Sequence, residues 1–80
     1  MRICKLTVLY NNEITETYYI NDDGFDDEDD FDRCIRLGIS ESFKDEKSKY
    51  MELYCMNEEF HIIDISNISK VTLKFYDMGE

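Results

Sequence analysis

The sequence predicts one α+β domain over residues 1–80, with an antiparallel sheet of about five strands and one helix packed on one face. Two alternating segments open the chain, a segment with helical spacing follows, and three more alternating segments close it, in the order β-β-α-β-β-β. A hydrophobic content of 42% and an aromatic content of 14% are enough to build a modest core in a chain of 80 residues.

The first twenty residues predict a β-hairpin. Residues 2–10 and 14–20 each alternate between apolar and polar side chains and are rich in β-branched and aromatic residues. The dipeptide Asn11–Asn12 between them favours a turn, because Asn tolerates left-handed backbone angles. The side chains expected to face the core are Cys4, Leu6, Val8, Tyr10, Ile14, Tyr18 and Ile20.

The middle of the chain predicts a helix from about Asp26 to Leu37, with Gly38 as the C′ residue that ends it. Acidic side chains fill the expected first turn, where the helix dipole favours negative charge. Residues 39–48 are expected to form a loop or a short helical turn. The apolar positions follow the i, i+3, i+4, i+7 pattern and are Phe31, Cys34, Ile35 and Gly38 or Ile39.

Three more strands are expected in the second half. Residues 49–56 and 59–65 form a second hairpin around a tight turn at Asn57–Glu58. After a polar connection, residues 71–76 form the last strand. The side chains expected to point inward are Met51, Leu53, Cys55, Val71, Leu73 and Phe75.

Negative charge is concentrated in one window, from Asp22 to Asp32. Eight of its eleven residues are acidic, while residues 1–21 are neutral and residues 33–80 carry a net charge of −2. Evenly spread charge would serve solubility as well and would reduce self-repulsion, so the clustering favours a docking surface over a merely solvated helix face. The acids of the window are Asp22, Asp23, Asp26, Asp27, Glu28, Asp29, Asp30 and Asp32.

The acidity also limits the choice of partner. A pI near 4.4 and a formal net charge of −10 argue against nucleic acid or an anionic membrane as a direct ligand, and favour a basic protein surface. No apolar run reaches the roughly 18–20 residues of a membrane span, and the first residues do not resemble a signal peptide. We therefore expect a cytoplasmic protein whose oligomeric state the sequence leaves open.

No catalytic motif or cofactor site is expected. The three cysteines, Cys4, Cys34 and Cys55, lie on apolar faces without metal-ligand spacing, and an acidic protein is a poor setting for a reactive thiolate. They are interpreted as buried thiols of a reduced protein. The one histidine, His61, lies within a predicted strand.

A calcium loop does not fit the acidic window. If Gly24 is taken as the sixth residue of an EF-hand loop, Tyr19 occupies the first position, where a carboxylate ligand is needed. Asp30 then occupies the twelfth position, where the motif has a bidentate Glu. No metal ligand is therefore assigned, although loose binding of divalent cations by clustered carboxylates stays open.

The candidate partner-binding residues are the eight acids and Phe25. Asp26 to Asp32 hold the docking charges, Asp22 and Asp23 are turn or capping residues, and Phe25 is an apolar anchor within an acidic rim. Phe31 is assigned to the core. A second contact surface would follow if tyrosines gather on the outer face of the sheet; the candidates are Tyr18, Tyr19, Tyr50, Tyr54 and Tyr76.

In size, charge and the Asp22–Asp32 run, the chain resembles the small acidic DNA-mimic inhibitors of phages, such as anti-CRISPR and anti-restriction proteins. The resemblance implies a non-enzymatic inhibitor whose carboxylates replace phosphates on the basic surface of a nucleic-acid-binding protein, most readily a CRISPR effector. Alternatives are an antitoxin or immunity protein against a basic nuclease, a small divalent-cation-binding or regulatory subunit, and an assembly protein that oligomerises through its sheet.

Overall fold

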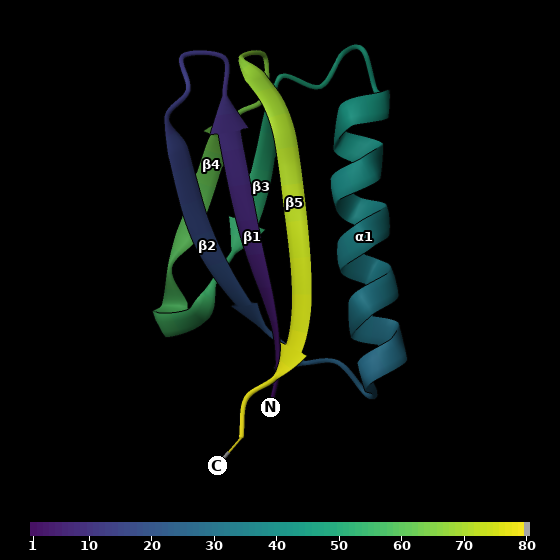
Figure 1. The fold of residues 1–80 in the computed structure, drawn as a ribbon. Helices are drawn as coiled ribbons and strands as arrows, with labels where there is room; N and C mark the ends of the chain where they lie inside the picture. Colours follow the sequence, from purple (N-terminus) through teal and green to yellow (C-terminus); the bar gives the residue numbers. More distant parts are fainter. Residues whose placement is uncertain (80) are drawn as a thin grey trace.

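The computed structural model describes residues 1–79 and confirms the α+β class and the element order, with five strands and one helix in that range (Figure 1). The strands are antiparallel but divide between two sheets instead of forming one. Strands β2, β1 and β5 form a three-stranded sheet in that order, and β3 pairs with β4. This division was not expected from the sequence, because alternation within a strand does not reveal which strand it pairs with.

The first hairpin forms as predicted. Strand β1 (Arg2–Tyr10) pairs with β2 (Thr15–Asn21), and the inward side chains Cys4, Leu6 and Val8 of β1 are completely buried. Ile14 was expected to face the core, but it is 56% exposed because it lies in the connection before β2 begins.

Strand β5 (Ile68–Asp77) pairs with the other edge of β1 and is longer than the predicted 71–76. Strand β1 is therefore the central strand of its sheet, hydrogen-bonded on both sides. Val71, Leu73 and Phe75 of β5 are half-buried against the core.

The second hairpin joins β3 (Tyr50–Tyr54) to β4 (Phe60–Asp64) through a 3₁₀ turn, η1 (Met56–Glu58). Asn57 (φ 64°) and Glu58 (φ 60°) both have left-handed backbone angles, which confirms the predicted tight turn. The predicted alternation is also confirmed, since the inward side chains of β3 are buried and its outward ones are exposed.

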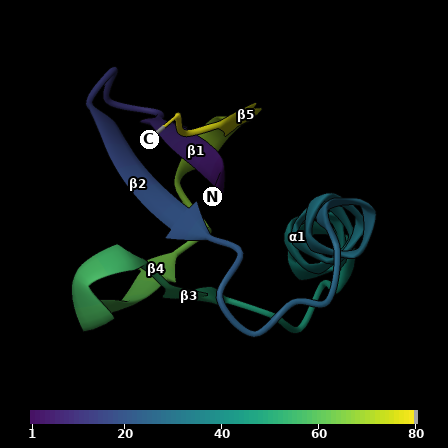
Figure 2. The ribbon, with the colours of Figure 1, turned by 90° about the horizontal axis from the view of Figure 1, so that it is seen from below.

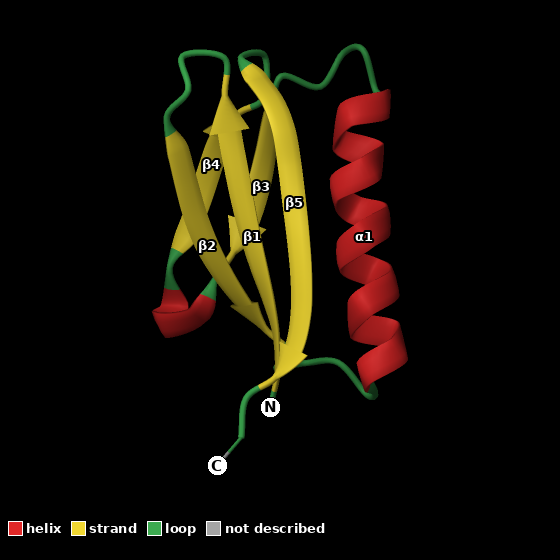
Figure 3. Cartoon of the chain, in the orientation of Figure 1, coloured by secondary structure: helices red, strands yellow, loops and turns green. Residues whose placement is uncertain are grey.

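The two sheets face each other, and helix α1 (Glu28–Lys44) runs along the open side next to β3 and β5 (Figures 2 and 3). The core lies between these three units. Phe31, fully buried, is the main contribution of the helix to it. The other members of the buried cluster are Cys4, Leu6, Val8, Ile20, Met51, Leu53, Cys55, Ile63 and Ile65.

The predicted end of the helix is wrong. Gly38 lies inside α1, which continues to Lys44 through residues expected to be a loop or short turn. Ile39 and Phe43 continue the four-residue spacing of Ile35, which explains why the helix does not stop at the glycine. Asp45 is the C-cap: its backbone is extended, and its N–H still donates to the Glu41 carbonyl, 3.2 Å away.

Candidate partner-binding surface

The acidic window forms the turn before α1 and the first turns of the helix. Asp27 is the N-cap: its backbone is extended, and its side chain accepts a hydrogen bond from the Asp30 N–H at 2.7 Å. Glu28, Asp29 and Asp30 occupy the first turn, where free N–H groups favour negative charge. The helix therefore begins two residues later than predicted, and Asp26 precedes the cap.

Asp32 holds the helix against the three-stranded sheet. Its two carboxylate oxygens accept hydrogen bonds from Arg2 Nε (3.1 Å) and Nη2 (2.7 Å), a bidentate ion pair with both side chains less than one-fifth exposed. The hydrogen bonds from Arg2 lower the pKa of Asp32, although partial burial opposes the shift. Arg2 Nη1 also reaches Asp77 at 3.3 Å. The oxygens of Asp32, expected to be docking charges, are thus engaged within the molecule.

Two more acids of the window have partners within the chain. Asp30 forms an ion pair with Arg33, three residues further along the helix. Asp22 accepts a hydrogen bond from the Arg2 backbone N–H at 3.3 Å, in agreement with its predicted role in the turn. These contacts reduce the number of carboxylates that are free to meet a partner.

Four exposed carboxylates remain: Asp23, Asp26, Glu28 and Asp29. Within residues 1–79, no Lys or Arg side chain forms an ion pair with any of them. They lie at the end of the molecule where α1 begins and where both chain termini are also found (Figure 1). The structure thus brings together part of the predicted acidic surface and separates Asp32 from it.

Phe25 lies between these acids and the core. Its ring is 37% exposed and packs edge-to-face on Phe31, with 5.2 Å between the ring centroids. Phe31 in turn packs edge-to-face on Phe75 at 6.0 Å, which confirms its assignment to the core. One side of Phe25 is therefore fixed by packing and the other is accessible within the acidic rim.

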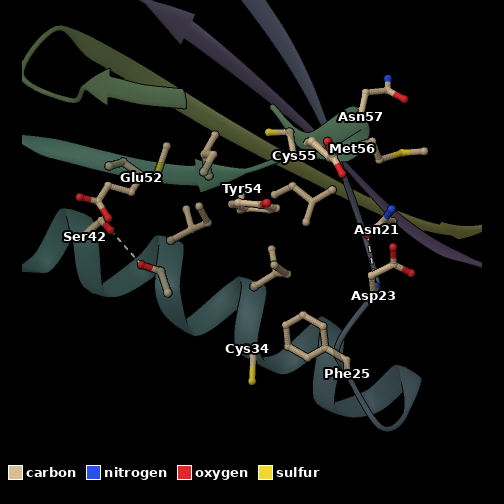
Figure 4. Close-up of a pocket in the computed structure, with 17 residues that line it drawn as sticks. Asn21, Asp23, Phe25, Cys34, Ser42, Glu52, Tyr54, Cys55, Met56 and Asn57 are labelled. Atoms are coloured by element: carbon tan, nitrogen blue, oxygen red, sulfur yellow. Dashed lines mark hydrogen bonds between the residues drawn. The ribbon is translucent and has the colours of Figure 1, made fainter. Parts of the chain in front are cut away.

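A groove of about 450 Å³ runs between α1 and β3 (Figure 4). The helix contributes the face that includes Ile35, Gly38 and Ile39, and Asp23 and Phe25 line the end nearest the acidic window. This groove was not predicted from the sequence, because the helix was expected to end at Leu37. The sequence feature that could have indicated the longer helix, and hence the groove, is the continued spacing of apolar side chains beyond Gly38.

The outward face of the β3–β4 hairpin carries four exposed apolar or aromatic side chains beside the exposed acids Glu52 and Asp64. The four are Tyr50 (62%), Tyr54 (69%), Phe60 (51%) and Ile62 (62%), and the ring centroids of Tyr54 and Phe60 lie 6.2 Å apart. Two of the expected tyrosines thus lie together, but Phe60 and Ile62 were not expected to join them. The signal for these two residues was the presence of apolar side chains on both faces of residues 59–65.

The cysteines differ from one another. Cys4 and Cys55 are buried, and burial raises the pKa of the Cys4 thiol to about 11 and also raises that of Cys55. Cys34 is exposed, so its predicted burial is wrong; it is among the residues that line the groove.

His61 has two side-chain neighbours: its Nε2 lies 3.0 Å from Glu59 Oε1, and its ring centroid lies 4.8 Å from that of Tyr18. In the part of the chain that the structure describes, no three His, Cys, Asp or Glu side chains are placed to hold a metal ion together.

Comparisons with protein-family models, with curated proteins and with solved structures gave no match. None of the helical residues described could form a membrane-spanning helix, because α1 is too short and too polar. The fold and the site therefore define a class rather than a family: a small α+β protein with two facing sheets, a single flanking helix in the described range, and an exposed acidic end.

Proposed function

We propose that this protein is a non-enzymatic inhibitor that binds the basic nucleic-acid-binding surface of a target protein, with a CRISPR effector as the first target to test. The observation that carries the proposal is the group of exposed carboxylates at one end of the molecule, Asp23, Asp26, Glu28 and Asp29, which no Lys or Arg of residues 1–79 pairs with. Such an inhibitor would act in the cytoplasm of a bacterial host, in the manner of an anti-CRISPR protein.

The chemistry of these residues supports a phosphate-binding surface as the target. Carboxylates accept charge-assisted hydrogen bonds from Arg and Lys side chains, as phosphate oxygens do. CRISPR effectors hold the guide heteroduplex in a positively charged channel and read the short motif beside the target with Arg side chains. Glu28 and Asp29 are in the first turn of α1, and Asp26 is two residues before the helix begins, so the three acids follow one another closely along the chain and a single basic channel can contact all three.

The test compares two triple variants of equal charge. Asp26→Asn, Glu28→Gln and Asp29→Asn together remove three of the four free charges but retain the cap at Asp27 and the ion pair at Asp32. The matched control neutralises three exposed acids near the opposite end: Glu13→Gln, Glu41→Gln and Glu46→Gln. Inhibition of DNA cleavage by a panel of purified effectors is measured at about 50 and 200 mM salt, with circular dichroism as the check on folding.

Loss of three charge-assisted hydrogen bonds of about 1.5 kcal/mol each should weaken inhibition by the first variant at least about 100-fold. The control variant should inhibit within about threefold of the unmodified protein, and inhibition should weaken steeply as salt rises. Equal inhibition by the first variant and the unmodified protein would show that these acids are not the docking charges. Failure to inhibit any effector would refute the choice of target.

A further inference from the structure

The β3 strand has an unpaired backbone edge that faces the groove beside α1. In the described part of the chain, β3 is hydrogen-bonded to β4 alone. Cys55 N–H donates to the Glu59 carbonyl at 2.7 Å, and Ile65 N–H donates to the Lys49 carbonyl at 3.0 Å. In an antiparallel pair these bonds recur at every second residue, so the odd-numbered residues 49–55 direct their N–H and C=O groups towards β4.

The backbone groups of Tyr50, Glu52 and Tyr54 therefore point away from β4, towards the helix. Among residues 1–79 no side chain or strand is hydrogen-bonded to them. Each of the three residues thus presents one free N–H donor and one free C=O acceptor along the groove. This spacing at every second residue is the pattern that a further strand requires. A helix or a small organic molecule cannot satisfy such a row, whereas an extended peptide can.

The walls of the groove suit alternate side chains of such a peptide. Ile35 and Ile39 of α1 face Met51 and Leu53 of β3 across it, which gives an apolar floor. Gly38, in the middle of the helical wall, has no side chain, and a β-carbon built there meets no atom within 4 Å. The groove therefore has open space beside the helix where a peptide would pass Gly38.

The negative charge of the groove favours a basic peptide. The groove is lined by three acids, Asp23, Glu52 and Glu58, and by no Lys or Arg. Its open end is next to the acidic surface, since Asp23 and Phe25 belong to both. A second copy of this chain is disfavoured as the occupant, because two molecules with a formal charge of −10 repel each other.

We infer that the α1–β3 groove binds an extended, basic segment of a partner protein, which adds to the free edge of β3 as a strand. Its apolar side chains would fill the groove between Ile35 and Met51, and its Lys or Arg side chains would meet the acidic rim. Of the carboxylates proposed to replace phosphates, only Asp23 also lines the groove, whereas Asp26, Glu28 and Asp29 lie outside it. Because the strand edge and the apolar walls do not depend on those three acids, the inference holds whether or not they inhibit a nuclease.

The test uses an eight-residue peptide of alternating Lys and Val, with blocked termini, as the probe. Two matched peptides serve as controls: one with Glu in place of Lys, and one with alternate peptide nitrogens methylated so that they cannot donate. Binding is followed by nuclear magnetic resonance of the ¹⁵N-labelled protein, and backbone hydrogen exchange is measured at saturation.

Strand addition predicts that exchange slows at least tenfold at the amides of Tyr50, Glu52 and Tyr54. The amides of Thr17 and Tyr19, which by the same alternation lie on the free edge of β2, should not change. The Glu peptide and the methylated peptide should each bind at least tenfold more weakly. Slowed exchange at β2 instead, or equal binding of the methylated peptide, would overturn the inference.

Substitutions at Gly38 test the same inference by changing the protein instead of the peptide. Gly38→Leu places a side chain in the groove and should weaken peptide binding at least tenfold, while Gly38→Ala adds one methyl group and should change it by less than threefold. Leucine is a strong helix former, so both variants should fold, which urea denaturation would verify. Undiminished binding to Gly38→Leu would overturn the inference. A dimer of the unmodified protein that Gly38→Leu dissociates would make a second copy the occupant, and would also overturn it.

Discussion

Gly38→Ala should stabilise the protein, whereas the same substitution at Gly24 should destabilise it. Gly38 is inside α1 with helical backbone angles, and a β-carbon there meets nothing within 4 Å, so alanine adds no clash. Replacing glycine by alanine in a helix interior contributes about 0.8–1 kcal/mol. For a domain of 60–100 residues, 1 kcal/mol corresponds to a rise in Tm of about 4–8 °C.

Gly24 provides the control because its surroundings are equally open but its φ is +87°. A β-carbon in the left-handed region costs roughly 1–2 kcal/mol, so Gly24→Ala should lower the free energy of unfolding by about that amount. Urea denaturation followed by far-ultraviolet circular dichroism measures both changes. A loss of stability in Gly38→Ala would mean that Gly38 is a left-handed C′ residue and that the helix ends at Leu37, which would refute the structure of residues 39–44.

Three other predictions concern the start of the helix. Asp27→Ala should destabilise the protein by about 1 kcal/mol through loss of the cap, while Asp27→Asn, which can still accept the hydrogen bond, should change the free energy of unfolding by only a few tenths of a kcal/mol in the same assay. Phe31→Ala should cost about 3–5 kcal/mol because the side chain is fully buried, and retention of near-ultraviolet circular dichroism at full thermal stability would contradict this. The hydrogen bonds from Arg2 lower the pKa of Asp32 in the folded protein. The stabilisation from this ion pair is therefore complete above the unfolded-state pKa near 3.9, and it is lost as the pH falls through the lower folded-state pKa. Asp32→Asn should therefore be less stable than the unmodified protein at pH 7, and the difference should shrink below about pH 4; a difference independent of pH would refute the ion pair as its cause.

The strands were predictable because their signal is local. Cys4, Leu6 and Val8 alternate with polar residues, and the structure buries all three. The turn at Asn57 was predictable for the same reason, since it depends on the backbone preference of one residue. The partition of the strands into two sheets was not, because it depends on contacts between segments far apart in the chain.

The helix end and the acidic site show where local reasoning fails. Whether a glycine ends a helix or lies inside one depends on the residues that follow it, and here Ile39 and Phe43 continue the apolar spacing of the helix. The position of the acidic residues was evident from the sequence, but their partners were not. Arg2 and Asp32 are separated by thirty residues, so no local pattern could show that this carboxylate was already bound.

The placement of the chain ends decides how the protein can be attached to a sensor surface or to a fluorescent protein. Both chain ends lie at the end of the molecule where α1 begins (Figure 1), so a tag fused at either of them would project from the end that carries the carboxylates whose binding is to be measured. The β1–β2 connection, residues 11–14, lies at the other end of the molecule. A cysteine introduced there at exposed Asn12, after replacement of exposed Cys34 by serine, would anchor the protein with its acidic end directed into solution.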